Sequence, residues 1–420
     1  MQRHMCWMMA VSMVLMPVVG ALAAEESPAG PVQIKPLEPI EASTDYRFES
    51  SAGPVVAQSD NQGRLWSWGT VASEGGKRVF KPASFPANNS RAGVKITKAA
   101  EGRIDVNIDG KLFTSLHYDK SEPKPFLWPV IGPYGNEVTR AYPMKELDTE
   151  RQDHWHHRSI WAAWGEVRTE KFAGTTNYWH QTKDPADQDR QVVKRIVRTE
   201  SGPVFGVIEM EVAWTARNGQ REFSELRTYT FYRGDEGSRM IDVKNVFKFD
   251  DCDVTFGDTK EAGILSVRIA TSMDEIGFPD RKKPGKGHMT NSNGGKGSDE
   301  CWGKAAAWCD YVGPVKGNTV GIAIFDDPKN MGHPTRWHIR NYGLYAANPI
   351  AVRPFVDLGK KATEAEKKAF KALPDTSKTW RKGESEVFNY RIVIHKGDTA
   401  CARVGEQYKL YTSGDTANMR

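Results

Sequence analysis

Residues 103–116 decide the fold class, and they read RIDVNIDGKLFTSL. Polar and apolar side chains alternate from Arg103 to Ile108, the pattern of a strand with one buried face. Asp109-Gly110 follows, and a second run continues to Leu116. An Asp-Gly pair between two such runs is a strong signal for a tight β-hairpin turn. The stretch therefore predicts an antiparallel hairpin.

The same pattern recurs outward from this hairpin. Asn218-Gly219 separates two further strand-like runs and predicts a second hairpin. One helix is expected over 364–373, with Thr363 as its cap. Further strands are expected at 193–198, 204–214, 222–232, 240–247, 264–269, 320–325 and 387–394. Evenly spaced strands with little helix favour an all-β fold, a large antiparallel β-sandwich with one or two short helices.

The N-terminal residues predict where in or outside the cell the protein is located. Residues 1–24 combine a basic start, an apolar run and small residues at 21–23, which is typical of a secretory signal peptide. Residues 25–45 hold four prolines and few large apolar groups, so we expect a flexible lead. Residues 46–420 are then a single large β-sandwich domain. The protein is expected to be periplasmic or secreted, with no membrane contact after signal cleavage.

An oxidising destination permits disulfides. The spacing does not choose among the three possible pairings of the four cysteines that remain. These are Cys252, Cys301, Cys309 and Cys401. Residues 277–300 are rich in Gly and Pro, and we expect a long functional or mobile loop there.

Composition excludes some classes of protein. The 420 residues include 13 Trp, 13 Tyr and 17 Phe, more than a disordered chain carries. The 58 Lys and Arg against 53 Asp and Glu give a net charge of +5, and no basic block stands out. Because nucleic-acid binders concentrate positive charge on one face, no nucleic-acid partner is expected.

Three of the ten histidines lie within residues 153–158, which read DHWHHR. In an extended segment, alternation would place His154, His156 and Arg158 on one face and His157 on the other. Imidazole serves as acid, base or metal ligand near neutral pH. The alternative to a functional site is a surface loop in which the histidines have no specific role. Flanking tryptophans, Trp161 among them, favour a half-buried site, because buried histidines need partners.

Three other segments carry candidate site residues. Residues 333–343 read HPTRWHIRNYG, and a strand there would align His338, Arg340 and Tyr342, a mixture typical of sugar sites but also of a structural corner. Lys260-Glu261 precedes an apolar strand, and a carboxylate at a sheet end can act as a general base, although such a pair is more often a solvated surface. Residues 126–131 read as a core strand. Trp128 before a turn and Arg140 after it are candidates for stacking and anion binding.

These motifs resemble the PmoA-like family of secreted bacterial proteins, which often carries a methane oxygenase label. The resemblance covers about residues 100–395. It rests on Val138-Thr139-Arg140, Asp153-His154-x-His156-His157-Arg158 with Trp161, Lys260-Glu261-x-Gly263 with Arg268, Pro328-x-Asn330, His333-Pro334-Thr335, Trp337-His338-x-Arg340-x-Tyr342-Gly343 and Asn348-Pro349. Trp155 stands where the family usually has Pro, and Ile350 where it usually has Phe.

The resemblance implies a galactose-mutarotase-like supersandwich, a fold that commonly acts on carbohydrates with a His acid and a carboxylate base. The oxygenase label fits poorly, because no apolar span of about 20 residues follows the signal peptide. Fold analogy alone does not fix the reaction.

Our leading hypothesis is a secreted enzyme that cleaves or isomerises a sugar by general acid–base catalysis, a glycoside hydrolase, lyase or epimerase, with no cofactor and no metal. The candidate catalytic residues are His156, His157 and Glu261. The candidate substrate-binding residues are Arg140, His154, Arg158, Trp128, Trp161, His180, Lys260, His333, His338, Arg340 and Tyr342.

Two alternatives remain open. A non-catalytic carbohydrate-binding protein would keep the aromatic and arginine residues but need no acid–base pair. A metalloenzyme would use His154, His156 and possibly His180 on a transition metal. All three hypotheses require the histidine segment and residues 333–343 to meet in space.

Overall fold

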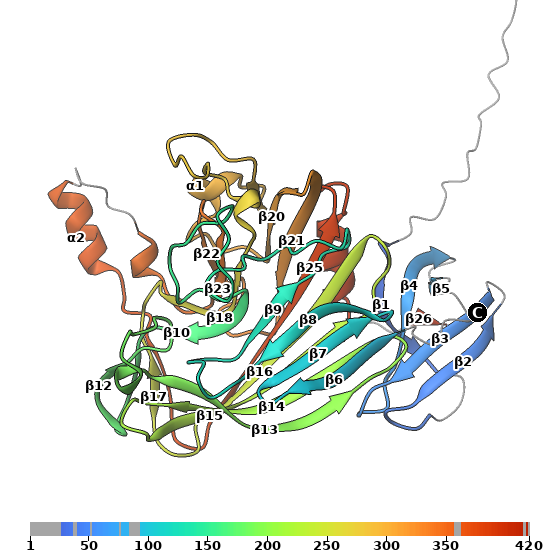
Figure 1. The fold of residues 1–420 in the computed structure, drawn as a ribbon, viewed down its shortest axis with the longest axis horizontal. Helices are drawn as coiled ribbons and strands as arrows, with labels where there is room; N and C mark the ends of the chain where they lie inside the picture. The colour runs from blue at the N-terminus through green and yellow to red at the C-terminus, as the bar shows by residue number, and fades with distance from the viewer. Residues whose placement is uncertain are drawn as a thin grey trace, which may run out of the picture.

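Two eight-stranded sheets packed face to face form the body of the protein (Figure 1). The computed structural model describes residues 27–36, 40–50, 53–74, 77–83, 93–356, 363–414 and 417–418. The predicted signal peptide lies outside the described residues. The expected all-β sandwich is confirmed, since strands make up most of the regular structure.

The first sheet carries the segments that the sequence singled out. Its strands, in spatial order, are β22 (Arg336–Ile339), β23 (Leu344–Asn348), β18 (Ala262–Arg268), β10 (Ile160–Trp164), β9 (Phe126–Val130), β8 (Lys111–His117), β7 (Arg103–Ile108) and β6 (Val94–Ala100).

The second sheet is built from longer strands. Its order is β13 (Arg190–Glu200), β14 (Phe205–Thr215), β15 (Arg221–Tyr232), β16 (Ser238–Lys248), β25 (Ser385–Lys396), β21 (Asn318–Asp326), β20 (Trp308–Val315) and β19 (His288–Asn291).

A four-stranded sheet, three α-helices and three 3-10 turns complete this part. The sheet is β12 (Phe172–Thr176), β11 (Val167–Thr169), β17 (Val254–Phe256) and β24 (Lys378–Trp380). The helices are α1 (Gly297–Cys301), α2 (Glu364–Ala372) and α3 (Val404–Thr412), and the 3-10 turns are Pro185–Asp187, Thr271–Met273 and Arg353–Phe355. The helix expected over 364–373 is confirmed as α2. The loop expected over 277–300 is interrupted, because β19 lies within it and α1 begins in it.

Five strands within residues 30–82 and one short strand near the C-terminus form a further sheet, which the sequence analysis did not predict. Its order is β1 (Gly30–Lys35), β26 (Ala417–Asn418), β5 (Lys77–Pro82), β4 (Leu65–Glu74), β3 (Gly53–Ser59) and β2 (Asp45–Ser50). The flexible lead is therefore wrong at 30–35. Val32 and Ile34 alternate with Gln33, pair with β4 and are buried, so they repay the entropy of ordering the strand.

This N-terminal sheet packs against the second sheet. Trp68 is fully buried in a cluster with Phe205 and Met240. The side chain of Gln58 donates to Glu200 at 3.0 Å and accepts from the backbone N–H of Phe205 at 3.0 Å. The contact is therefore both apolar and hydrogen-bonded.

The hairpin read from residues 103–116 is present as β7 and β8. Asp109 and Gly110 have φ of 51° and 80°, the left-handed values that a tight hairpin turn requires. Ile104, Val106 and Ile108 are buried in the core between the two sheets, as alternation predicts.

Replacing Gly219 with Ala is expected to destabilise the protein by about 1 kcal/mol. Gly219 turns β14 into β15 with φ of +84°, and an added Cβ meets nothing within 4 Å, so the cost is conformational. Gly405→Ala in α3 is the control, with an expected gain of about 0.5 kcal/mol, because its Cβ makes an ordinary contact and Ala favours helix. Urea denaturation of both variants measures the change in the free energy of unfolding, which should fall for Gly219→Ala and rise for Gly405→Ala.

The central strands of the first sheet are buried on both faces. Every residue of β10, β18 and β23 is buried. Ile160 and Trp164 of β10 face the core between the sheets, while Trp161 and Ala163 face a second apolar cluster on the other side. That second face is where the candidate site lies.

Candidate functional site

Residues 153–158 form a turn before β10, not an extended segment. His154 has φ of 46°, and the N–H of His157 donates to the carbonyl of His154 at 2.9 Å. Ring centroids lie 4.9 Å apart for His154 and His157, and 4.5 Å apart for His156 and His157. The expected placement of His157 on the opposite face is wrong, because the left-handed residue reverses the chain and gathers all three rings.

Arg140 lies beneath this turn and holds it. Its side chain is fully buried. Nη1 donates to the carbonyls of Arg151 at 3.1 Å and Asp153 at 2.7 Å, and Nη2 donates to that of His154 at 3.1 Å. A guanidinium whose donors are taken by backbone oxygens supports the site from below. The structure thus gives Arg140 a different place from the ligand contact expected from the sequence.

Asp153 ties the turn to β18. Its Oδ1 accepts from Arg268 Nη2 at 2.7 Å, and Arg268 Nη1 donates to Nδ1 of His157 at 2.9 Å. Burial would raise the pKa of Asp153, but His154 and Arg268 hold it far below its usual range. Burial and then the charge of Arg268 hold the pKa of His157 well below its usual value. His157 is therefore a neutral, anchored ring.

The floor of the site is a row of residues in register across five strands. Phe126 pairs with Trp161, Trp161 with Ser266, Ser266 with Ala346, and Ala346 with His338. Strand alternation explains the row, since the neighbours of His338 on β22, Trp337 and Ile339, face the core instead.

Trp179 joins the two ends of this row. Its ring centroid lies 5.7 Å from that of Trp161 and 6.0 Å from that of His338. His157 stacks on Trp161 at 5.3 Å, and His154 stacks on Tyr342 at 4.9 Å with 6° between the planes. The two histidine-bearing segments, far apart in sequence, therefore meet. We call this group the histidine–tryptophan cluster: His154, His156, His157, Trp161, Trp179, His180, His338 and Tyr342.

Aromatic and cationic groups form the rim. Arg340 lies over the rings of Trp302 and Tyr342, at 5.4 and 5.6 Å from their centroids. Phe355 packs edge-on against Trp302 at 5.6 Å and against His338 at 5.9 Å. Each of these residues comes from a turn or a strand end, so the rim is built by loops.

Glu261 supplies a carboxylate at the end of β18. It precedes the strand directly and pairs with Lys260. Burial would raise its pKa, but Lys260 and His338 bring the pKa below its usual value, so the carboxylate is ionised at neutral pH. Its charge in turn opposes the lowering of the pKa of His180 and His338, so the carboxylate lies within electrostatic range of both rings.

Besides Nδ1 of His154, which lies 3.1 Å from Oδ1 of Asp153, four buried ring nitrogens of the cluster have no hydrogen-bond partner among the described residues. They are Nε1 of Trp161, Nε1 of Trp179, Nε2 of His156 and Nδ1 of His338. These side chains are 1%, 0%, 8% and 3% exposed. Because buried polar groups nearly always find partners, four orphans in one place indicate a site that a hydroxyl-rich ligand or water completes.

Burial also keeps the histidines uncharged. It lowers the pKa of His156 to about 2, helped by Lys124, and that of His338 to about 3, against the charge of Glu261. At neutral pH these rings are neutral hydrogen-bonding groups, not imidazolium acids.

The remaining sequence candidates lie at different distances from the cluster. Arg158 lies over Phe126 at 5.2 Å and donates to Glu122 at 2.8 Å. Trp128 is on β9, two residues from Phe126, and half-buried. Nδ1 of His333 lies 2.8 Å from Oδ2 of Asp326, the last residue of β21. No contact within the described ranges joins His333 to the cluster.

A family model described as a family of unknown function, DUF6807, matches residues 103–409, more than half of the chain. The chain belongs to the DUF6807 family. The match includes every candidate site residue. The PmoA-like resemblance is a finer statement and stays a prediction. No curated protein matches the sequence.

Two solved structures have a distant likeness to this DUF6807 protein. One is a GH36 α-galactosidase from Geobacillus stearothermophilus with raffinose, at 12% identity and a TM-score of 0.30, covering 88% of this chain and 43% of that chain. The other is a polysaccharide lyase, also at 12% and 0.30, covering 75% and 34%. The DUF6807 chain spans less than half the length of either. These values are too low to support an inference about activity.

Five residues that shape the site in this DUF6807 protein escaped the sequence reading. They are Lys124, Asn177, Trp179, Trp302 and Phe355. The amine of the buried Lys124 donates to the carbonyl of Trp179 at 2.6 Å, and burial holds its pKa well below its usual value. Only Trp179 carried a signal, because it precedes His180 in a run of aromatic residues.

The described residues of the DUF6807 chain hold neither a group of metal ligands nor a membrane-spanning helix. Within the part of the chain that the structure describes, no three His, Cys, Asp or Glu side chains converge as metal ligands would. The described cysteines are free thiols, with Cys252, Cys301 and Cys309 buried and Cys401 exposed. None of the described helices is long and apolar enough to span a membrane.

Acid is expected to destabilise the protein partly through His338. The ring's pKa is about 6.5 when unfolded and about 3 when folded, so below pH 6.5 only the unfolded chain takes up the proton. By pH 5 this costs about 2 kcal/mol. His338→Gln is expected to flatten the loss by that amount in urea denaturation at pH 7 and pH 5. His288→Gln, at the exposed first residue of β19, is the control and is expected to leave this loss unchanged.

Proposed function

We propose that the protein is a secreted or periplasmic carbohydrate-active enzyme that cleaves or isomerises a sugar by general acid–base catalysis. The observation that carries this proposal is the set of four unpartnered ring nitrogens around one aromatic floor, next to an ionised carboxylate. Sugars offer hydroxyl groups to such nitrogens and C–H faces to rings such as those of Tyr342 and Trp302.

Each group has a role in this scheme. Glu261, ionised and within electrostatic range of His180 and His338, is the base that accepts the proton and then, once protonated, returns it to the departing or migrating oxygen. His156 has a free Nε2 and is the candidate for hydrogen bonding to the departing or migrating oxygen. His157 is enclosed by Trp161 and Trp179 and bound by Arg268, so it orients its neighbours and does not touch the substrate.

The test is a product assay. The purified mature protein is incubated with a panel of oligosaccharides, polysaccharides and free sugars, and products are followed by chromatography and NMR. We expect one class to be converted by the wild type, and at a much lower rate by His156→Ala. An unchanged rate in His156→Ala removes the residue assignment, and no conversion of any panel member opposes the enzyme.

A non-catalytic carbohydrate-binding protein is the second candidate, and one observation favours it. The histidines with resolved shifts at the site all have a lowered pKa, so none is a charged acid at neutral pH. Calorimetric titration of the same panel separates the two. Binding that saturates, with no product after long incubation, supports this candidate.

A further inference from the structure

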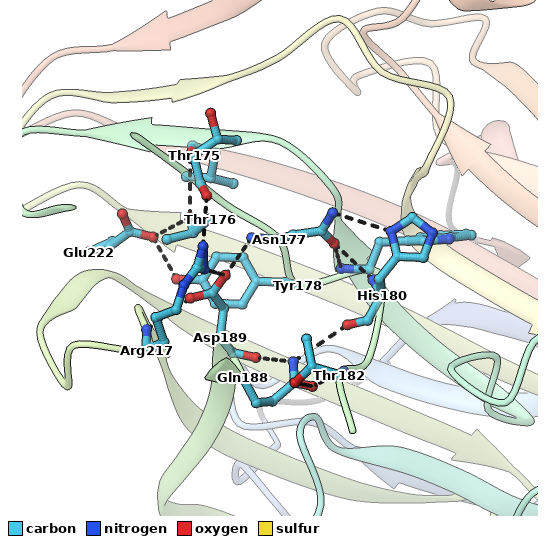
Figure 2. A network of polar contacts seen from close by, with 12 residues as sticks. Thr175, Thr176, Asn177, Tyr178, His180, Thr182, Gln188, Asp189, Arg217 and Glu222 are labelled. Carbon is cyan, nitrogen blue, oxygen red and sulfur yellow. Dashed lines mark hydrogen bonds and ion pairs between the residues drawn. The ribbon is translucent and has the colours of Figure 1, made fainter. Parts of the chain in front are cut away.

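The segment that carries His180 is fixed to the second sheet from several sides (Figure 2). The hydroxyls of Thr176 and Tyr178 donate to Glu222 at 2.7 and 2.6 Å. The N–H of Asn177 donates to buried Asp189 at 2.7 Å. A backbone held at these points leaves little freedom to the residue between them.

The side-chain amide of Asn177 has one possible orientation. Its Oδ1 accepts from the backbone N–H of Trp179 at 3.1 Å and of His180 at 2.8 Å. Turning the amide over would set its NH₂ group against these two donors. The Nδ2 of Asn177 therefore faces Nδ1 of His180, at 3.2 Å, as the dashed line in Figure 2 shows.

An amide NH₂ group can only donate, so Nδ1 of His180 must accept. A neutral imidazole that accepts at Nδ1 carries its proton on Nε2. The ring of His180 lies 4.7 Å from that of His156, and the residue is exposed, so a ligand can reach Nε2.

We propose that Asn177 is a positioning residue that holds His180 as the neutral Nε2–H tautomer, which makes His180 a hydrogen-bond donor to the ligand and excludes it as a base. This rests on the proposed function for the identity of the ligand, a sugar hydroxyl or ring oxygen. It gives the site a directed donor beside the carboxylate of Glu261.

The charges around His180 agree with a neutral ring. Partial desolvation of the ring lowers its pKa, although the residue as a whole is exposed. Lys124, Lys260 and His154 act in the same direction, and Glu261 opposes them. The ring of His156 is in contact with the ring of His180, and the pKa of His156 is also lowered. No charged partner accepts a proton from Nδ1, since that position faces Asn177.

NMR of the full-length mature protein labelled with ¹⁵N in its histidine rings tests this without any substrate. Signals of His180 are assigned with His180→Gln. In the wild type we expect an unprotonated Nδ1 and a protonated Nε2 between pH 6 and 8. Asn177→Asp keeps the acceptor for the two backbone N–H groups but presents a carboxylate to Nδ1. There we expect a proton on Nδ1 and a rise of about one unit in the pKa of His180, a tenfold change in proton affinity.

Asn318→Asp, at the first residue of β21, makes the same change of charge away from the cluster. It is expected to leave the tautomer and the pKa of His180 unchanged. A proton on Nδ1 in the wild type overturns the proposal, and this spectrum decides even if Asn177→Asp does not fold. An unchanged His180 pKa in a folded Asn177→Asp also overturns it. Expected spectra with no sugar bound or converted leave the tautomer assignment standing and oppose the proposed function instead.

Discussion

Glu261→Gln is expected to lower turnover at least ~100-fold while changing substrate affinity by less than about threefold. The amide has nearly the same shape and still accepts a hydrogen bond, but it cannot take a proton at neutral pH. Steady-state kinetics and calorimetric binding with the converted sugar measure the two quantities. Glu211→Gln is the control, because Glu211 on β14 pairs with the exposed Arg195 of β13.

The pH profile gives this prediction a second readout. Lys260 lowers the pKa of Glu261, so Lys260→Met is expected to raise that pKa. A base must be ionised to act, and the acid limb of the rate profile should therefore move to higher pH. A Glu261→Gln enzyme with near wild-type turnover, or an acid limb that stays in place in Lys260→Met, would show that another group is the base.

Arg140→Met is expected to destabilise the protein by about 3–5 kcal/mol. The substitution leaves buried carbonyls of the 151–157 turn without donors and removes one cation from Asp153. Urea denaturation measures the loss. Arg103→Met, which breaks an exposed ion pair with Asp105, is the control and should cost less than about 1 kcal/mol.

The position of Arg140 predicts a further difference between the two variants. Loss of Arg140 should disturb the histidine rings that it supports, so the ring signals of His154 and His157 in NMR should broaden or shift. Similar stability losses in Arg140→Met and Arg103→Met would mean that the turn is held by other contacts.

Local patterns were sufficient for much of the fold. Asp109-Gly110 and Asn218-Gly219 mark hairpins because Asp109, Gly110 and Gly219 adopt left-handed φ values that few other residue types tolerate. Alternation assigns Ile104 and Val106 to the core. The same rule failed at residues 30–35, where prolines hid a short buried strand. It failed again at 153–158, where His154 takes a left-handed conformation that no periodic pattern announces.

The site was harder to read because its members come from separate strands and loops. Residue types pointed to His156, His338 and Tyr342, but their contacts depend on sheet order. Trp179 gave only a weak signal and Asn177 gave none, since the importance of both residues lies in what surrounds them. Arg140 stood out by its charge, yet its burial beneath the turn follows only from the assembled structure.

Strands that are buried on both faces tolerate few substitutions. A change at Trp161 or Ser266 alters the sheet as well as the histidine–tryptophan cluster, because both residues lie on central strands of the first sheet. Trp302, Arg340 and Phe355 sit on connections that tolerate exchange. Among related chains, substitutions that change ligand preference should therefore accumulate at the rim, while the central strands of the first sheet stay the same.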